Sequence, residues 1–218
     1  MKNSSSKVKE TERKTASFIV ALVVCCILMS SGCTYSGAIR TDIAPTAIVG
    51  KKSPARVGVY FEPRLEQYVE RTTPSTVYGS AYTYLFEMGP ALKEALTRGV
   101  RVAYSDVSVL TTRPQPGKFD RVICFDLQSS NVRIEFVPGF WTETAKADAI
   151  LHIVMEAKDG LSLSDIQRLT VSGNGFSTKP SYVGAEAHKH FSIAIEDAIR
   201  QVTENTANLL ISGVAEPR

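Results

Sequence analysis

The fold is decided by residues 144–158, Thr-Ala-Lys-Ala-Asp-Ala-Ile-Leu-His-Ile-Val-Met-Glu-Ala-Lys. Small and apolar side chains alternate here with polar ones, which is the period of a β-strand with one buried and one wet face. The buried set is Ala145, Ala147, Ala149, Leu151, Ile153 and Met155, and the opposite set includes Lys146, Asp148, His152, Glu156 and Lys158. A strand of this length with one solvated face favours an antiparallel ribbon.

The neighbours of this strand are predicted on both sides. Asp-Gly at 159–160 is a turn signal, so residues 165–176 are expected to return as the hairpin partner. Gly173 and Gly175 in that partner predict a bulge or a close backbone contact. Residues 121–136 predict a preceding strand.

Near the C-terminus, from about Ala185, the apolar period changes to that of a helix. The apolar stripe consists of Phe191, Ala194, Ile195, Ala198, Ile199, Val202 and Leu209, and the polar side of Glu196, Asp197, Arg200, Gln201, Glu204 and Asn208. This long helix needs a sheet face to cover. The alanine-rich side of residues 145–155 allows a close approach.

Upstream, residues 55–62 alternate and predict the first strand, and residues 100–110 predict another. A helix is expected to begin at Gly89-Pro90, since proline there gives up an amide that would be unpaired anyway, and Gly99 is expected to cap it. Residues 64–84 predict a long loop or one containing a short strand. This order argues for an α+β two-layer sandwich, a mainly antiparallel sheet covered by two helices, the C-terminal one long.

The first 33 residues have the build of a secretory signal: basic residues, an apolar run at 18–29, then small residues. The run is shorter than the roughly 20 residues that span a bilayer as a helix. Residues 29–33, Met-Ser-Ser-Gly-Cys, resemble the lipobox of bacterial lipoproteins. In that family the cysteine receives a diacylglyceryl group, the peptide before it is removed, and the new N-terminus is acylated. Ser30 stands where leucine is usual.

The resemblance implies lipidation at Cys33, with fatty acyl groups such as palmitate, and removal of residues 1–32 as a lipoprotein signal peptide. A single acyl chain holds a protein only marginally, whereas two or more hold it firmly. Thr34 replaces the aspartate that retains such proteins in the inner membrane, so the expected location is the outer membrane, on the periplasmic side. The alternative is an uncleaved signal anchor.

Removal of the signal peptide changes the charge balance. The chain has 25 basic and 22 acidic residues, and residues 1–32 contain five and two of them, which leaves 20 of each. A mature chain without net charge lacks the excess of basic residues that is typical of nucleic-acid-binding proteins. We expect the acylated cysteine and a flexible tether at 33–53, a single periplasmic domain at 54–212 and a disordered C-terminal tail at 213–218.

No pattern of a catalytic or metal site is recognised. Cys124 is the one cysteine left unmodified and lies in an apolar run, which is typical of a small buried side chain. His188 and His190 do not face each other on a helix, and no phosphate loop, nucleophile elbow or H-E-x-x-H motif occurs. The sequence therefore predicts no enzyme, no metal and no cofactor.

Two aromatic features predict binding. Phe140 and Trp141, the sole tryptophan, are expected at a hairpin tip, where exposed aromatics are typical of a partner-binding site; the alternative is that they fold back onto the core. Tyr78, Tyr82 and Tyr84 form a candidate lid over a small ligand or glycan. The alternative there is a loop that covers the sheet.

The order of elements over residues 55–212 resembles the small periplasmic lipoproteins of the YajG kind and, more loosely, lipoprotein accessories of envelope assembly. The similarity rests on Ala-Arg-Val-Gly-Val at 55–59, Gly-Pro-Ala-Leu-Lys-Glu-Ala-Leu at 89–96, Ala-Asp-Ala-Ile-Leu-His at 147–152 and Lys-Asp-Gly at 158–160. It implies a non-catalytic accessory or adaptor of a membrane or envelope complex, with an envelope protein as partner. It assigns no functional residue and no oligomeric state. The alternative is a ligand-binding or glycan-binding lipoprotein.

Overall fold

The computed structural model describes residues 33–46, 52–76, 82–139, 143–181 and 187–213. The chain divides into two units, residues 1–33 and 34–218, and of the first unit only Cys33 is described. The second unit contains every helix and strand of the described residues, with β1 alone beginning one residue earlier at Cys33.

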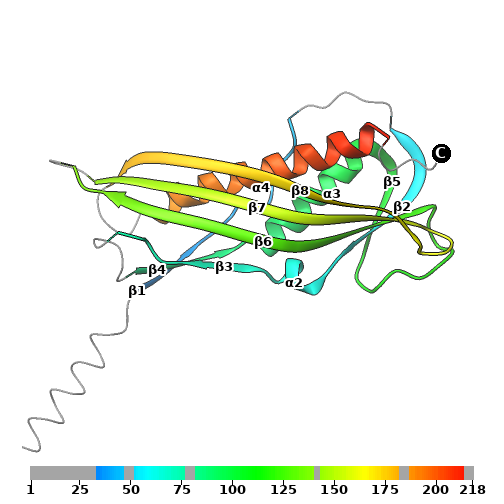
Figure 1. Ribbon diagram of the computed structural model, residues 1–218, viewed down its shortest axis with the longest axis horizontal. Helices are drawn as coiled ribbons and strands as arrows, with labels where there is room; N and C mark the ends of the chain where they lie inside the picture. The colour runs from blue at the N-terminus through cyan, green and yellow to red at the C-terminus, as the bar shows by residue number, and fades with distance from the viewer. Residues whose placement is uncertain (1–32, 47–51, 77–81, 140–142, 182–186, 214–218) are drawn as a thin grey trace, which may run out of the picture. The chain divides into compact units, whose positions relative to one another are not determined.

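A five-stranded sheet of order β5-β2-β6-β7-β8 forms the larger layer (Figure 1). Its strands are β2 (Ser53–Phe61), β5 (Tyr104–Leu110), β6 (Arg121–Val137), β7 (Glu143–Asp159) and β8 (Asp165–Ser181). Strands β6, β7 and β8 are antiparallel and 17 residues long each, which confirms the predicted ribbon. Because β2 runs parallel to both of its neighbours, the sheet as a whole is mixed.

Strand β6 contains a β-bulge, which changes the set of side chains that it turns to the core. Leu127 lies opposite Ile153 and Ser129 lies opposite His152, so Gln128 is the extra residue. The core residues of β6 are odd-numbered before the bulge (Ile123, Phe125 and Leu127) and even-numbered after it (Val132, Ile134 and Phe136). One extra residue thus lets a single long strand bury an apolar side along its whole length.

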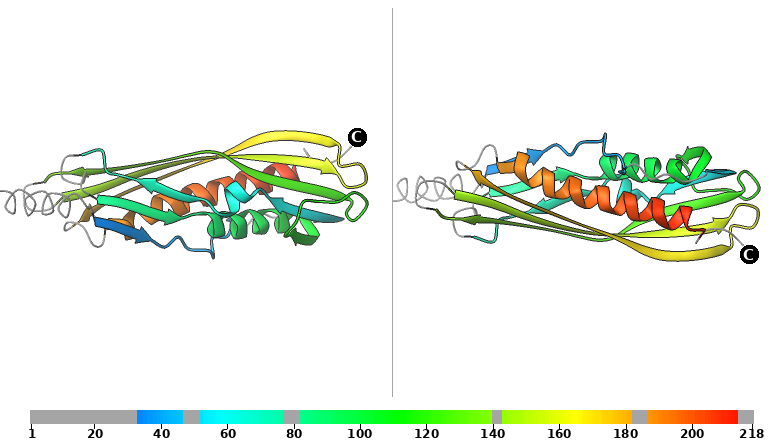
Figure 2. Two further views of the ribbon diagram at one scale, coloured as in Figure 1. Left: turned by 90° about the horizontal axis from the view of Figure 1, so that it is seen from below. Right: turned by 90° about the horizontal axis from the view of Figure 1, so that it is seen from above.

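Helices α3 (Gly89–Ala103) and α4 (Ala187–Ile211) lie on one face of the sheet and pack against each other (Figure 2). The apolar stripe predicted for the C-terminal helix is confirmed from Phe191 to Val202. The prediction that Gly99 caps α3 is wrong, because the helix continues through it to Ala103. Gly99 lies where the two helices meet, and a Cβ on it would be 3.0 Å from the backbone oxygen of Thr203.

The close backbone contact predicted at Gly173 and Gly175 is confirmed, and it is made with α4. A Cβ added to Gly173 would lie 2.2 Å from the carbonyl oxygen of Ala198. At Gly175 it would lie 1.8 Å from the carbonyl oxygen of Ala194. The two glycines therefore form the seat of α4 on β8, beside the alanine side of β7.

A three-stranded sheet of order β1-β4-β3 covers the other part of the core. Its strands are β1 (Cys33–Gly37), β3 (Val69–Thr72) and β4 (Tyr82–Glu87), and the short helix α2 (Pro63–Glu66) precedes β3. The Tyr84 and Phe86 side chains of β4 are fully buried, and the ring centroid of Tyr84 lies 5.1 Å from that of Phe191 in α4. The two-layer α+β class is therefore confirmed.

Residues 34–46 correct the prediction of a flexible tether. Ile39 is 8% exposed and belongs to the core. The backbone amide of Arg40 donates a hydrogen bond to Glu196 of α4 at 3.1 Å, and that of Thr46 donates to Glu204 at 3.0 Å. Because these contacts and the pairing of β1 satisfy backbone groups that a tether leaves to water, this segment is part of the folded unit.

Candidate functional site

The candidate site lies on the outer face of β6, β7 and β8, opposite the side chains that enter the core, and it reaches α4 at the β8 edge. Side chains alternate between the two faces of a strand, so this face carries the residues between those that enter the core. Ile150 is 40% exposed and Phe176 is 55% exposed, and both belong to it. Large apolar side chains exposed side by side on one face indicate an interaction surface.

An open hollow of about 710 Å³, named here the ribbon hollow, surrounds these two side chains. Two rows of cross-strand neighbours form its floor. The rows are Asn131, Ile150 and Asn174, and Arg133, Asp148 and Phe176. The pairing register of β6, β7 and β8 places these six side chains together. This register is set by the β7–β8 turn and by the alternate residues of β7 that face the core.

Helix α4 forms the wall of the ribbon hollow next to β8. Gln201 accepts a hydrogen bond from the backbone amide of Asn174 at 3.0 Å, and Asp197 and Arg200 pair with each other. On the floor, within the described residues, the carboxylate of Asp148 and the side-chain amide of Asn131 have no hydrogen-bond partner. The hollow therefore offers polar groups that are free to bind.

A smaller hollow of about 260 Å³ lies on the same face, nearer the β7–β8 turn, and Cys124 lines it. Cys124 is 8% exposed, which confirms the prediction of a small buried side chain. Burial raises the pKa of its thiol to about 11. Since the thiolate is the nucleophile, this cysteine is a weak one at neutral pH.

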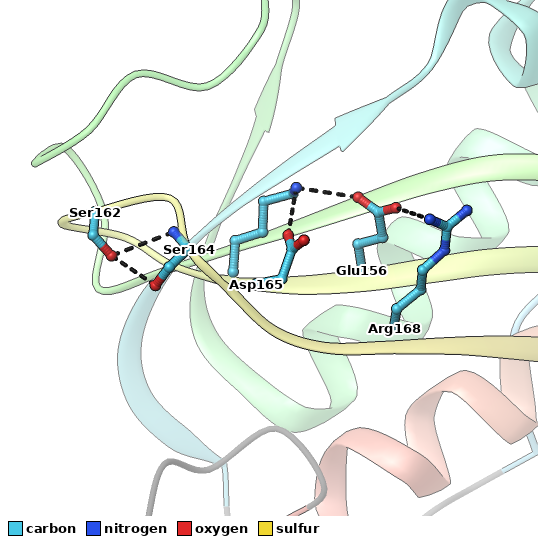
Figure 3. Close-up of polar contacts among 6 residues, drawn as sticks. Glu156, Ser162, Ser164, Asp165 and Arg168 are labelled. Carbon is cyan, nitrogen blue, oxygen red and sulfur yellow. Dashed lines mark hydrogen bonds and ion pairs between the residues drawn. The ribbon is translucent and has the colours of Figure 1, made fainter.

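An ion-pair network ties β7 to β8 beside the smaller hollow, and Figure 3 shows Glu156, Ser162, Ser164, Asp165 and Arg168 of this region. The ammonium of Lys158 lies 2.7 Å from Asp165 and 3.2 Å from Glu156. The hydrogen bond from Lys158 holds the pKa of Asp165 below its ordinary value and raises that of Lys158. Because these residues join β7 to β8 beside the turn, we interpret the network as one that stabilises the hairpin, not as a ligand-binding site.

Of the tyrosines predicted to bind a ligand, Tyr84 lies in the core. Its ring centroid is 5.7 Å from that of Tyr35, and burial raises the pKa of its hydroxyl to about 12. Tyr82 is half-buried and contacts Tyr35 edge to face at 5.6 Å. Tyr78 lies outside the described residues. The two described rings thus pack over the small sheet, as in the alternative interpretation of this segment.

The remaining predicted residues are only partly described. Cys33 begins β1, but its side chain is not described, so its lipidation stays a prediction. Phe140 and Trp141 lie outside the described residues. Within the described ranges, no three His, Cys, Asp or Glu side chains gather in a way that could hold a metal ion. In the same ranges, no helix has both the length and the apolar character needed to cross a bilayer.

The two edges of the five-stranded sheet differ. At the β8 edge, Gln201 accepts from the Asn174 amide and Asn205 donates to the carbonyl of Ser172 at 2.8 Å. At the opposite edge, β5 pairs with β2 on its inner side, and the described residues place no backbone hydrogen bond on its outer side. An open edge of this kind is a template for another strand.

Sequence reasoning missed the ribbon hollow, and it proposed docking at a sheet edge without identifying β5 as that edge. A signal for the hollow exists, because Ile150, like Val154, is an apolar residue on the mainly polar side of residues 144–158. No comparable signal exists for the edge, since the alternation of residues 104–110 is the same whether or not a further strand pairs with them.

No family model matches the chain, and no curated protein matches it. Among solved structures, a DUF330 protein from Xanthomonas campestris is 13% identical with a TM-score of 0.45, covering 83% of this chain and 97% of its own. A minor lipoprotein from Acinetobacter baumannii is 7% identical with a TM-score of 0.41, covering 75% and 96%. Similarities this low carry no argument about function.

Proposed function

We propose that this chain is a lipid-anchored bacterial envelope protein that acts, without catalysis, as an adaptor of a larger membrane or envelope complex. An extended segment of its partner protein docks on the outer edge of β5. The observation that carries this proposal is the difference between the two sheet edges: α4 side chains bond the β8 edge at Ser172 and Asn174, whereas no described residue makes a backbone hydrogen bond to the outer side of β5.

The anchor is supported by the lipobox-like residues 29–33 and by the place where the folded unit begins. Acylation of Cys33 would put the lipid on the residue at which β1 starts. Residues 34–37 continue that strand, and Ile39 enters the core. Hardly any free chain would separate the lipid from the folded unit, so a partner has to meet it at the membrane surface.

The chemistry of β5 suits an added strand. Val107, Val109 and Leu110 are only half-buried, so a partner strand would cover them further. Its outer backbone groups would gain hydrogen bonds, which is how peptides add to open sheets. The strand is seven residues long, and Ser105, Asp106 and Ser108 are exposed. A short edge with a charge disfavours unspecific pairing between copies.

Photo-crosslinking in intact cells tests the proposal. A photoreactive amino acid is placed at Ser105 or Ser108 on β5 and, as matched exposed controls, at Thr178 or Lys179 on β8. We expect the β5 positions to crosslink to one envelope protein and the β8 positions to give little or no product with it, because the partner segment docks on the β5 edge. Equal crosslinking from both edges, or none from β5, would contradict the proposal.

A further inference from the structure

The ribbon hollow combines exposed apolar surface with unpaired polar side chains. Phe176 and Ile150 are exposed by 55% and 40%, and the side chains of Asn131, Asp148 and Asn174 lie beside them in the two cross-strand rows. Ligand sites commonly combine an apolar surface with a few placed polar groups, in volumes of roughly 300–1,000 Å³. The hollow, at about 710 Å³, fits that description.

We propose that the ribbon hollow binds a neutral oligosaccharide. A pyranose ring has an apolar face of C–H groups and a rim of hydroxyls, so it needs an apolar platform next to groups that donate and accept hydrogen bonds. Phe176 supplies an aromatic platform. The Asn131 and Asn174 amides each donate and accept, and the Asp148 carboxylate accepts.

The charges that line the hollow cancel. Arg133 and Arg200 are balanced by Asp148 and Asp197, and Arg200 is already paired with Asp197. Arg133 pairs with Glu135, which does not line the hollow, at 2.7 Å. Because the lining side chains carry no net charge, the site favours a neutral sugar over an anionic or cationic ligand.

The backbone around the hollow disfavours an extended peptide as the occupant. Strand β7 is paired on both sides, with β6 and with β8. The outward amide of Asn174 on β8 already donates to Gln201. A peptide strand would therefore find the Asn174 amide already bonded, whereas sugar hydroxyls need only the side chains. The site is separate from the β5 edge, which lies at the other end of the strand order.

Calorimetric titration of the purified full chain in detergent tests this site. The probes are maltotriose, cellotriose and chitotriose, with sialyllactose as an anionic comparison. We expect at least one neutral trisaccharide to bind with a Kd of about 1 mM or tighter. Phe176→Ala should weaken that binding about tenfold because the platform is lost, while Phe176→Tyr keeps the ring and should keep the affinity.

Two further variants complete the test. Asp148→Ala removes an exposed acceptor from the floor and should also weaken binding, which keeps the test open if Phe176→Ala fails to fold. Leu161→Ala, at a side chain 72% exposed in the hairpin turn, should leave affinity unchanged. If no neutral trisaccharide bound at about 10 mM, roughly ten times the expected Kd, the proposal would be overturned. Tighter binding of sialyllactose, or unchanged affinity in Phe176→Ala and Asp148→Ala, would overturn it too.

Discussion

Gly175→Ala is expected to lower the free energy of unfolding by about 3 kcal/mol or more, as overpacking against fixed backbone does. The added Cβ would lie 1.8 Å from the carbonyl oxygen of Ala194 and 2.7 Å from the amide nitrogen of Ala198. Both atoms belong to the backbone of α4, so the clash is relieved only by lifting the helix off β8. Urea unfolding followed by circular dichroism measures the change.

Thr178→Ser, at an exposed position on the same strand, is the matched control. It should change the free energy of unfolding by no more than about 0.5 kcal/mol. If Gly175→Ala unfolded at the same urea concentration as the unchanged chain, α4 would not be seated on β8 as described.

Cys33→Ser is expected to move nearly all of the protein out of the membrane fraction or leave it as the uncleaved precursor. A serine hydroxyl cannot form the thioether that carries the diacylglyceryl group, and without acyl chains the hydrophobic contribution of about 0.8 kcal/mol per buried methylene is lost. Detergent phase partitioning and intact-mass spectrometry measure the outcome. The unchanged chain should begin at residue 33 and carry the mass of the lipid.

Cys124→Ala is the control for loss of a thiol elsewhere, and this variant should keep the lipid and the membrane association. A Cys33→Ser variant that stayed in the membrane, together with an unchanged chain that still began at Met1, would instead support the uncleaved signal anchor.

Sequence periodicity was enough to predict an element and its buried face where that element has a long and regular pattern. Residues 144–158 gave the ribbon strand, and the stripe from Phe191 to Val202 gave α4, because alternation over many residues decides which face is buried. Gly173 and Gly175 were also interpreted correctly, since glycine inside a strand has few explanations other than a bulge or a close backbone.

The predictions that failed depend on contacts between distant parts of the chain. From the local sequence, Gly99 is expected to be a helix cap. In the structure it is a contact position instead, because Thr203, about a hundred residues later in the chain, lies against it. Residues 34–46 were predicted to be a tether because they show no sustained apolar period and contain Gly37 and Pro45. The parallel pairing of β2 and the exposure of β5 depend on strand order, which no local pattern encodes.

Hydrogen exchange at β5 tests the proposed docking most directly. The chain is measured alone and in the complex isolated from solubilised membranes, with peptides covering residues 104–110 and 165–181. Docking at β5 predicts slower exchange of residues 104–110 in the complex and unchanged exchange in β8, which α4 already bonds at Ser172 and Asn174. Unchanged exchange of residues 104–110, or protection that appears in β8 instead, would contradict it.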